Sequence, residues 1–211
     1  SSDLTVEIIS RAACEAGCPK GAVSAISVPT MEATQALMKS EHTALILATG
    51  GGAMVKSAYS SGTPAIGVGA GNGPAFIDKS ADIKKAVKQI LDSKTFDNGT
   101  ICASEQSIIV ERCMEAKVVE ELKSQGAFVL TQEQSRQLGK FILRANGTMN
   151  PMIVGKTCAQ IAEYAGLCGV PSSARVLVGR ETKVGADAPY SREKLAPILG
   201  LFVEENTDRV L

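Results

Sequence analysis

The sequence predicts an α/β fold with a doubly wound parallel sheet, and two observations support this prediction. Over residues 4–69, segments with helical periodicity alternate with short apolar segments at the spacing of βαβ units, and the second half of the chain is also α/β. In addition, residues 43–48 form a nearly continuous apolar run, which is typical of a parallel strand buried on both faces.

Each expected element follows from a local pattern. The helices have apolar residues three and four positions apart, and two of them open with a capping box, at Thr131 to Gln134 and at Thr157 to Gln160. The strands are short apolar runs between turns. The expected helices are residues 4–16, 31–39, 53–60, 80–94, 114–123, 131–146 and 157–166, and the expected strands are residues 21–28, 43–48, 65–69, 107–110, 127–130 and 174–179.

Composition excludes several classes of function. Of the 211 residues, 45% are hydrophobic and 21% are charged, and the net charge is zero, so neither nucleic acid nor an acidic membrane is an expected partner. No apolar run has transmembrane length. The six cysteines lack paired CxxC spacing and predict reduced thiols in a cytoplasmic protein, and the single histidine, His42, argues against a metal site.

A turn near the middle of the chain contains the main candidate for a catalytic residue. Asn98 and Gly99 both tolerate a positive φ and predict a turn, and Cys102 follows it. A thiol held between a helix and a strand, beside the small side chains of Ala103 and Ser104, can act as a nucleophile. A buried structural cysteine on a tight connection is the alternative.

The helix that leads into this turn has one apolar and one charged face. Ile83, Val87 and Ile90 lie on the stripe expected to be buried, together with Ala86 and Leu91. The lysines at positions 84, 85 and 88 lie outside this stripe and predict a solvated surface rather than a binding patch. Because no histidine lies beside Cys102, the donors that favour its thiolate are expected to be backbone N–H groups.

Two glycine-rich segments are candidates for contact with a ligand. Residues 49–52, Thr-Gly-Gly-Gly, lie between an expected strand and an expected helix, where backbone N–H groups can bind an anion. A plain strand-to-helix turn explains this segment equally well. From Gly67 to Gly73 every second residue is glycine, so one face of an extended segment has no side chains. Either a ligand or another segment therefore approaches this backbone closely.

Three segments in this order resemble the CoA-acylating aldehyde dehydrogenases. They are residues 48–56 (Ala-Thr-Gly-Gly-Gly-Ala-Met-Val-Lys), 67–74 (Gly-Val-Gly-Ala-Gly-Asn-Gly-Pro) and 96–106 (Phe-Asp-Asn-Gly-Thr-Ile-Cys-Ala-Ser-Glu-Gln). A fourth, residues 192–197, is similar to the family's Glu-x-x-x-Pro segment. The resemblance covers essentially the whole chain. It extends to the aldehyde dehydrogenase half of bifunctional aldehyde–alcohol dehydrogenases and to stand-alone acetaldehyde and butyraldehyde dehydrogenases.

The resemblance implies roles for individual residues. Cys102 matches the nucleophile, and Glu193 matches the residue that holds the nicotinamide ribose; an ordinary loop carboxylate is the alternative for Glu193. Val68 stands where hydrolytic aldehyde dehydrogenases have the glutamate that activates the deacylating water. A valine cannot accept a proton, whereas a thiol needs less help than water, so CoA is expected to remove the acyl group.

The resemblance also implies a cofactor-binding group. By similarity, Thr49, Gly50 and Gly51 would lie along the pyrophosphate of NAD, and Val68 and Gly69 belong to the same cofactor-binding set. The dinucleotide fold of this family is unorthodox, so the lack of a GxGxxG motif is no objection.

The expected reaction joins an aldehyde, CoA and NAD⁺ reversibly to acyl-CoA and NADH through a thioester on a cysteine. A homo-oligomer is expected, and a fused alcohol dehydrogenase half remains open. The chain starts without Met and is expected to be an internal part of a subunit. Residues 1–70 would be the second part of the NAD-binding domain and residues 71–211 the first part of the catalytic domain. The alternative is an inactive fragment or a scaffold subunit of an enzyme assembly.

Overall fold

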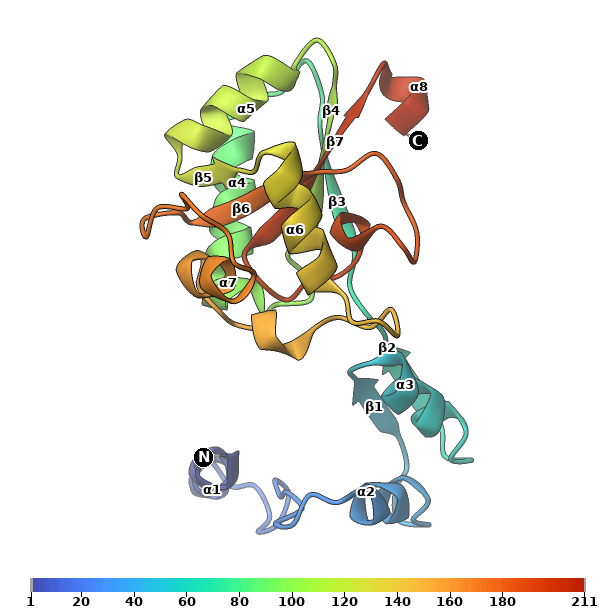
Figure 1. Ribbon diagram of the computed structural model, residues 1–211. Helices are drawn as coiled ribbons and strands as arrows, with labels where there is room; N and C mark the ends of the chain where they lie inside the picture. The colour runs from blue at the N-terminus through green and yellow to red at the C-terminus, as the bar shows by residue number, and fades with distance from the viewer. Residues whose placement is uncertain (1, 211) are drawn as a thin grey trace. The chain divides into compact units, whose positions relative to one another are not determined.

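The computed structural model describes residues 2–210 (Figure 1). The chain divides into two compact units, Ser1–Gly69 and Ala70–Leu211, which are described separately below. Both units are α/β, as the sequence predicts, and their strands form two different parallel sheets. In the part of the chain that the structure describes, no helix combines the length and the apolar character needed to cross a bilayer.

The first unit contains one parallel pair of strands. Its elements are α1 (Ser2–Glu15), α2 (Met31–Met38), β1 (Ile46–Thr49), α3 (Gly52–Tyr59) and β2 (Ala65–Val68). Helix α3 connects β1 to β2. Its Ala58 packs with Met38 of α2 and with Ile46 and Ala48 of β1. These four buried residues, with the half-buried Ala65, form a small apolar core on one face of the strand pair.

Two expectations for the first unit are wrong. Residues 21–28 form turns and coil instead of a strand, because none of the described strands pairs with them and an unpaired strand leaves its backbone groups unsatisfied. The strand expected at residues 43–48 begins only at Ile46 and is buried on one face. Ile46 and Ala48 are buried, whereas Leu47 is 72% exposed.

The second unit is a five-stranded parallel sheet with helices on both faces, in the strand order β3-β4-β7-β6-β5. Its elements are β3 (Gly73–Ile77), α4 (Ile83–Thr95), η1 (Phe96–Gly99), β4 (Glu105–Glu111), α5 (Glu115–Ser124), β5 (Ala127–Val129), α6 (Gln132–Ile142), η2 (Pro151–Ile153), α7 (Cys158–Tyr164), β6 (Val176–Arg180), η3 (Pro189–Ser191), β7 (Ile198–Glu204) and α8 (Thr207–Val210).

Successive residues of the central strands alternate between two apolar cores. Val176 and Val178 of β6 pack in one cluster with the apolar faces of α4 and α5, whereas Leu177 packs in the other with α6 and α7. Figure 1 shows these two helix pairs on opposite sides of the sheet. This unit is therefore α/β, as predicted; the doubly wound sheet was expected for residues 4–69, where the structure has one parallel pair of strands, and it is found here instead.

Local signals set most helix ends in the second unit correctly. Both predicted capping boxes are present, at Thr131 with Gln134 and at Thr157 with Gln160. Helix α4 begins later than expected, because the Asp82 side chain accepts a hydrogen bond from the backbone of Lys85 and caps it there. Helix α6 was expected to reach residue 146 but ends at Ile142.

The sequence interpretation missed two strands of this sheet, β3 and β7. Strand β7 is the more important, because it lies in the middle of the sheet between β4 and β6. Gly200 interrupts the apolar pattern of this strand. A Cβ at position 200 would lie 2.8 Å from the carbonyl oxygen of Tyr190, so a larger residue does not fit there. A glycine that permits close packing weakened the strand signal in the sequence.

Candidate active site

The amino ends of three neighbouring strands meet at one edge of the five-stranded sheet. Strands β3, β4 and β7 are adjacent and parallel, so the residues just before them share this edge. Gly71 precedes β3, Cys102 precedes β4 and Glu193 precedes β7. The topology therefore brings the predicted nucleophile and the predicted ribose-binding carboxylate to the same edge of the second unit.

The turn that carries Cys102 has a constrained backbone. Residues 97–99 have φ values of 47°, 50° and 74°, which confirms the positive φ predicted for Asn98 and Gly99 and adds Asp97. Ser104 N–H then donates to the carbonyl oxygen of Ile101 at 3.1 Å, which closes the chain around Cys102. The side chain of Cys102 is exposed, so the alternative of a buried structural cysteine is wrong.

Gly71 connects the Cys102 turn to the Glu193 segment. Its N–H donates to Oε1 of Glu193 at 2.8 Å. A Cβ at this position would lie only 2.0 Å from the carbonyl oxygen of Cys102. At Gly71, the close approach predicted from the glycine alternation is thus made by another segment of the protein. Asn72 strengthens the connection, because its side-chain amide donates to the carbonyl oxygen of Ser191 at 2.8 Å.

Two fully buried lysines lie at the same edge. Nζ of Lys94, from the last turn of α4, donates to Oε1 of Gln106 at 3.2 Å and contacts Oγ of Ser104 at 3.4 Å. The same Gln106 oxygen accepts the backbone N–H of Lys194 at 3.1 Å. Nζ of Lys194 donates to the carbonyl oxygens of Tyr190, at 2.8 Å, and of Arg192, at 2.7 Å.

Burial governs the protonation of both lysines. It lowers the pKa of Lys94 to about 8, although the carboxylates of Glu105 and Glu193 partly oppose this effect. Burial also lowers the pKa of Lys194, to well below its ordinary value; the positive charge of Lys94 adds to this effect and Glu193 opposes it. Oε2 of Glu105 is buried and has no hydrogen-bond partner among the described residues.

Five of the six residues predicted to bind the cofactor lie together in the first unit, and the sixth, Glu193, belongs to the second. Thr49 pairs with Val68 where β1 and β2 end, and the N–H of Gly50 donates to the carbonyl oxygen of Val68 at 3.3 Å. Gly51 is the N-cap of α3, and Gly69 directly follows β2. All five residues are exposed, and a Cβ added at Gly51 or Gly69 would meet no atom within 4 Å.

The glycine at position 67 has a different role from its neighbours. A Cβ there would lie 2.5 Å from a methyl group of Val55 and 2.8 Å from the ring of Tyr59, both on α3. The Tyr59 hydroxyl also accepts a hydrogen bond from Gly67 N–H at 2.9 Å. Close packing of helix on strand, and not a ligand, explains the glycine at this position.

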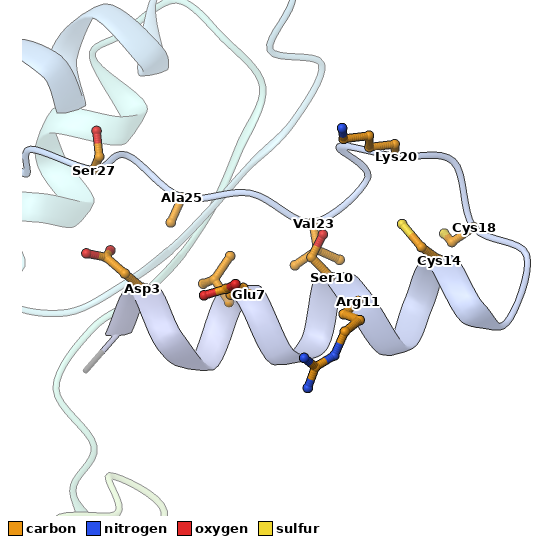
Figure 2. A pocket seen from close by; sticks show the side chains of 11 residues that line it. Asp3, Glu7, Ser10, Arg11, Cys14, Cys18, Lys20, Val23, Ala25 and Ser27 are labelled. Atoms are coloured by element: carbon orange, nitrogen blue, oxygen red, sulfur yellow. The ribbon is translucent and has the colours of Figure 1, made fainter.

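A cavity of about 740 Å³ lies between α1 and the following loop, but it contains none of the predicted site residues. Figure 2 shows that it is lined by Cys14 and Cys18 at one end and by Asp3 and Ser27 at the other. Neither cysteine belongs to a set of three or more side chains able to hold a metal, and no such set exists among residues 2–210.

Comparison with known proteins identifies the class of protein. The model of the aldehyde dehydrogenase family matches residues 1–191, and the chain belongs to this family. Among the curated relatives, the aldehyde–alcohol dehydrogenase of Clostridium acetobutylicum is 44% identical over 211 residues, which are all of this chain and 24% of that protein. The chain therefore spans about a quarter of the length of this relative.

Solved structures of the same family have the same fold. A probable aldehyde dehydrogenase from Listeria monocytogenes is 63% identical with a TM-score of 0.95, over 99% of this chain and 46% of that one. An acetylating aldehyde dehydrogenase from Geobacillus thermoglucosidasius is 49% identical, with a TM-score of 0.93, over 98% and 45%. Propionaldehyde dehydrogenase from Rhodopseudomonas palustris, solved with bound CoA and an acylated cysteine, is 31% identical, with a TM-score of 0.86, over 98% and 46%.

Sequence reasoning missed the buried residues behind Cys102. Lys94 lies three residues after Leu91 and seven after Val87, so it continues the apolar stripe of α4. A lysine on a stripe expected to be buried could have indicated a buried charged group near Cys102. Gln106 and Lys194 gave no such signal, because their burial depends on strand β7, which the sequence did not reveal.

Proposed function

We propose that the protein acts as a CoA-acylating aldehyde dehydrogenase. An aldehyde, CoA and NAD⁺ give acyl-CoA, NADH and a proton, and the reaction is reversible. The observation that supports this most strongly is the exposed Cys102 on a constrained turn, joined to Glu193 through Gly71. The names of the Geobacillus and Rhodopseudomonas relatives, an acetylating enzyme and one solved with CoA and an acylated cysteine, support the same activity.

In the proposed mechanism, Cys102 forms and releases a thioester. Its thiolate adds to the aldehyde carbonyl, and the backbone N–H of Cys102 would donate to the resulting oxyanion. NAD⁺, held by Thr49, Gly50, Gly51 and Glu193, would supply the acceptor for the hydride of this adduct. The thiol of CoA then attacks the acyl group, and the Cys102 thiolate leaves. The acyl group is thereby transferred from one sulfur to the other, and the enzyme returns to its initial state.

Two exposed glycines of the first unit leave room for a cofactor to approach the backbone. Gly51 and Gly69 are exposed and open on the side where a Cβ would project, so a pyrophosphate can approach the backbone there. We assign Thr49, Gly50 and Gly51 to the pyrophosphate of NAD and Glu193 to the nicotinamide ribose. The two units would then be the second part of the NAD-binding domain, residues 1–70, and the first part of the catalytic domain, residues 71–211.

The side chain at position 68 is the one expected to act as a general base if water released the acyl group. Val68 is 48% exposed and has no atom that can accept a proton. Water attacks a thioester slowly without a general base, whereas a thiol is the stronger nucleophile and needs less help. The absence of a base at position 68 therefore supports release by CoA.

The test is the dependence of NADH formation on CoA. With aldehyde and NAD⁺ but no CoA, the intact protein should make at most one NADH per site and then stop; CoA should restore steady turnover. Val68→Glu should increase CoA-independent release of free acid, by less than the roughly 10²–10⁴-fold of a well-placed base, and Val68→Gln, the matched control, should not. Repeated turnover of the unmodified protein to free acid without CoA would overturn the proposal.

An inactive or structural chain is the second candidate, and one observation favours it. Leu47 and Ile66 are 72% and 54% exposed on one face of the β1–β2 pair. Such a face is typical of a surface that binds another polypeptide. The CoA experiment separates the two candidates, because a purely structural chain makes no NADH under any condition.

We further propose that the protein works in the cytoplasm as a homo-oligomer. The zero net charge and the six cysteines without a disulfide support this location. The name of the Clostridium relative supports a fused alcohol dehydrogenase half in the whole protein. Substrates of the proposed activity are small aldehydes and, in reverse, acyl-CoA.

A further inference from the structure

Lys94 makes an unusual set of contacts for a lysine. Its side chain is fully buried, and its ammonium group lies between Ser104 and Gln106, two and four residues after Cys102. Burying an ammonium group is costly unless hydrogen bonds and opposite charges compensate it. A leucine or methionine would satisfy the apolar stripe of α4 without this cost, so the contacts themselves need an explanation.

The ammonium group determines the orientation of the Gln106 amide. A lysine can only donate hydrogen bonds, so Lys94 and the backbone N–H of Lys194 must both contact the amide oxygen. The amide nitrogen is then left to donate to the carbonyl oxygen of Ser104, at 3.4 Å. Ser104 is also the residue whose N–H closes the turn over Cys102. The lysine thus acts on both residues that hold the turn to β4.

We propose that Lys94 is the positioning residue of the Cys102 site: it holds the Cys102 turn on β4 through Ser104 and Gln106. This inference rests on the proposed function of Cys102.

The charges around Lys94 set the pH range of this effect. Glu105 of β4 and Glu193 before β7 favour its charged form, whereas burial opposes it, and the charge of Lys94 in turn lowers the pKa of the neighbouring Lys194. With a pKa of about 8, Lys94 is charged at neutral pH and loses its proton in the mildly alkaline range. Its hold on Ser104 and Gln106 should therefore weaken as the pH rises above about 8.

The test measures the reactivity of Cys102 in the 211-residue chain, which needs no enzymatic turnover. A neutral alkylating agent, iodoacetamide, is added for short times between mildly acidic and alkaline pH, and peptide mass mapping gives the rate at Cys102 relative to the exposed Cys168. The variants are Lys94→Met, Lys94→Arg and the control Lys85→Met, which removes an exposed lysine from the same helix.

We expect Cys102 in the unmodified chain to react faster than Cys168 at neutral pH. Lys94→Met should reduce this ratio severalfold, because Ser104 and Gln106 then lose the ammonium group that holds the turn on β4. Lys94→Arg, which keeps the charge, should retain most of the reactivity, and Lys85→Met should change nothing. A folded Lys94→Met chain with the unmodified ratio and pH profile would overturn the inference and leave the role of Cys102 intact.

A second measurement needs no variant and covers the case in which Lys94→Met fails to fold. In a chain with ¹⁵N-labelled glutamine, the side-chain amide signal of Gln106 should shift with pH at about 8, where Lys94 loses its proton. A Gln106 signal that does not change in this range would contradict the inference. If Cys102 in the unmodified chain is alkylated no faster than Cys168, both the inference and the proposed role of Cys102 fail.

Discussion

The two units of this chain contain the same kinds of element but bury them differently. In the second unit, four successive residues of β6, Val176 to Gly179, are buried, because helices cover both faces of the sheet. In the first unit, β1 alternates buried and exposed residues, and Leu47 and Ile66 project from an uncovered face. The second unit has the features of an independent core; the first has a core of only four buried residues.

The difference shows where the chemistry of the site is supported. Cys102 and Glu193 lie at the edge of the well-packed sheet. Buried hydrogen bonds from Lys94 and Lys194 hold Gln106 of β4, and the N–H of Gly71 donates to Glu193. The glycine-rich residues proposed to bind the cofactor lie on the less buried unit. A nucleophile must be held closely to its working geometry, whereas a pyrophosphate needs only accessible backbone N–H groups.

The largest expected effect is the loss of a core side chain from the second unit. Ile108 is fully buried in the central strand β4, so Ile108→Ala should lower the free energy of unfolding by about 2–5 kcal/mol. Urea denaturation followed by circular dichroism measures this. The comparison of the two units would fail if Ile66→Ala in the first unit cost as much, because Ile66 is half exposed.

The buried Lys94 should make the stability of the second unit depend on pH. Burial lowers its pKa from 10.5 to about 8, so between these values the unfolded chain holds more protons than the folded chain, and stability rises with pH. Below about 8 the full cost is present, of the order of 3 kcal/mol. Lys94→Met should lack this rise.

The control for this pH effect is to compare the unmodified chain with Lys94→Met at each pH, because other groups titrate in the same range. Burial lowers the pKa of Lys194 as well, which adds a rise of the same sign, and it raises the pKa of Cys158 to about 12, which lowers stability at high pH. The Cys158 contribution persists in Lys94→Met, whereas the Lys194 contribution becomes smaller, because the charge of Lys94 no longer adds to it. Parallel stability curves for the two chains would contradict the account of Lys94.

A smaller effect is expected where the Cys102 turn meets the Glu193 segment. The Cβ introduced by Gly71→Ala would clash with the carbonyl oxygen of Cys102, and overpacking of this kind costs about 1–3 kcal/mol. The alkylation rate of Cys102 should fall more than that of Cys168. Gly69→Ala is the matched control, since a Cβ there meets nothing within 4 Å. Equal effects of the two substitutions would refute the proposed contact.

The smallest effect is expected on the uncovered face of the first unit. Leu47→Ser removes an apolar side chain that is 72% exposed, so the free energy of unfolding should change by no more than about 0.5 kcal/mol. Binding of a dye that recognises exposed apolar surface should decrease. A large loss of stability would show that Leu47 is covered in solution, against the comparison drawn between the units.

The same comparison explains what the sequence could predict. Periodicity and capping boxes identified most helices of both units, because these signals are local. Strand β7 was missed, because Gly200 interrupts its apolar pattern. This glycine allows close packing against Tyr190, which is a contact that no local pattern reveals. The strand expected at residues 21–28 has the right composition, but it lacks a pairing partner among the described strands.

For the site, the sequence identified residues but not their surroundings. Cys102 and its turn followed from Asn98 and Gly99, and the structure confirms the positive φ and the exposure. The meeting of Cys102 with Glu193 depends on the adjacency of β4 and β7, which no local pattern reveals. The roles of these residues, and of Val68 and the glycines, remain predictions.

The most direct test of the central claim is acyl transfer from acetyl-CoA to the protein. The Cys102 thiolate should displace CoA and take up one acetyl group, which peptide mass mapping would locate on Cys102 and not on the exposed Cys168. Added free CoA should remove the acetyl group from Cys102. The variant Cys102→Ser should show no acetylation that free CoA can remove. A protein that takes no acetyl group at Cys102, or that labels Cys168 equally, would contradict a CoA-acylating aldehyde dehydrogenase with Cys102 as its nucleophile.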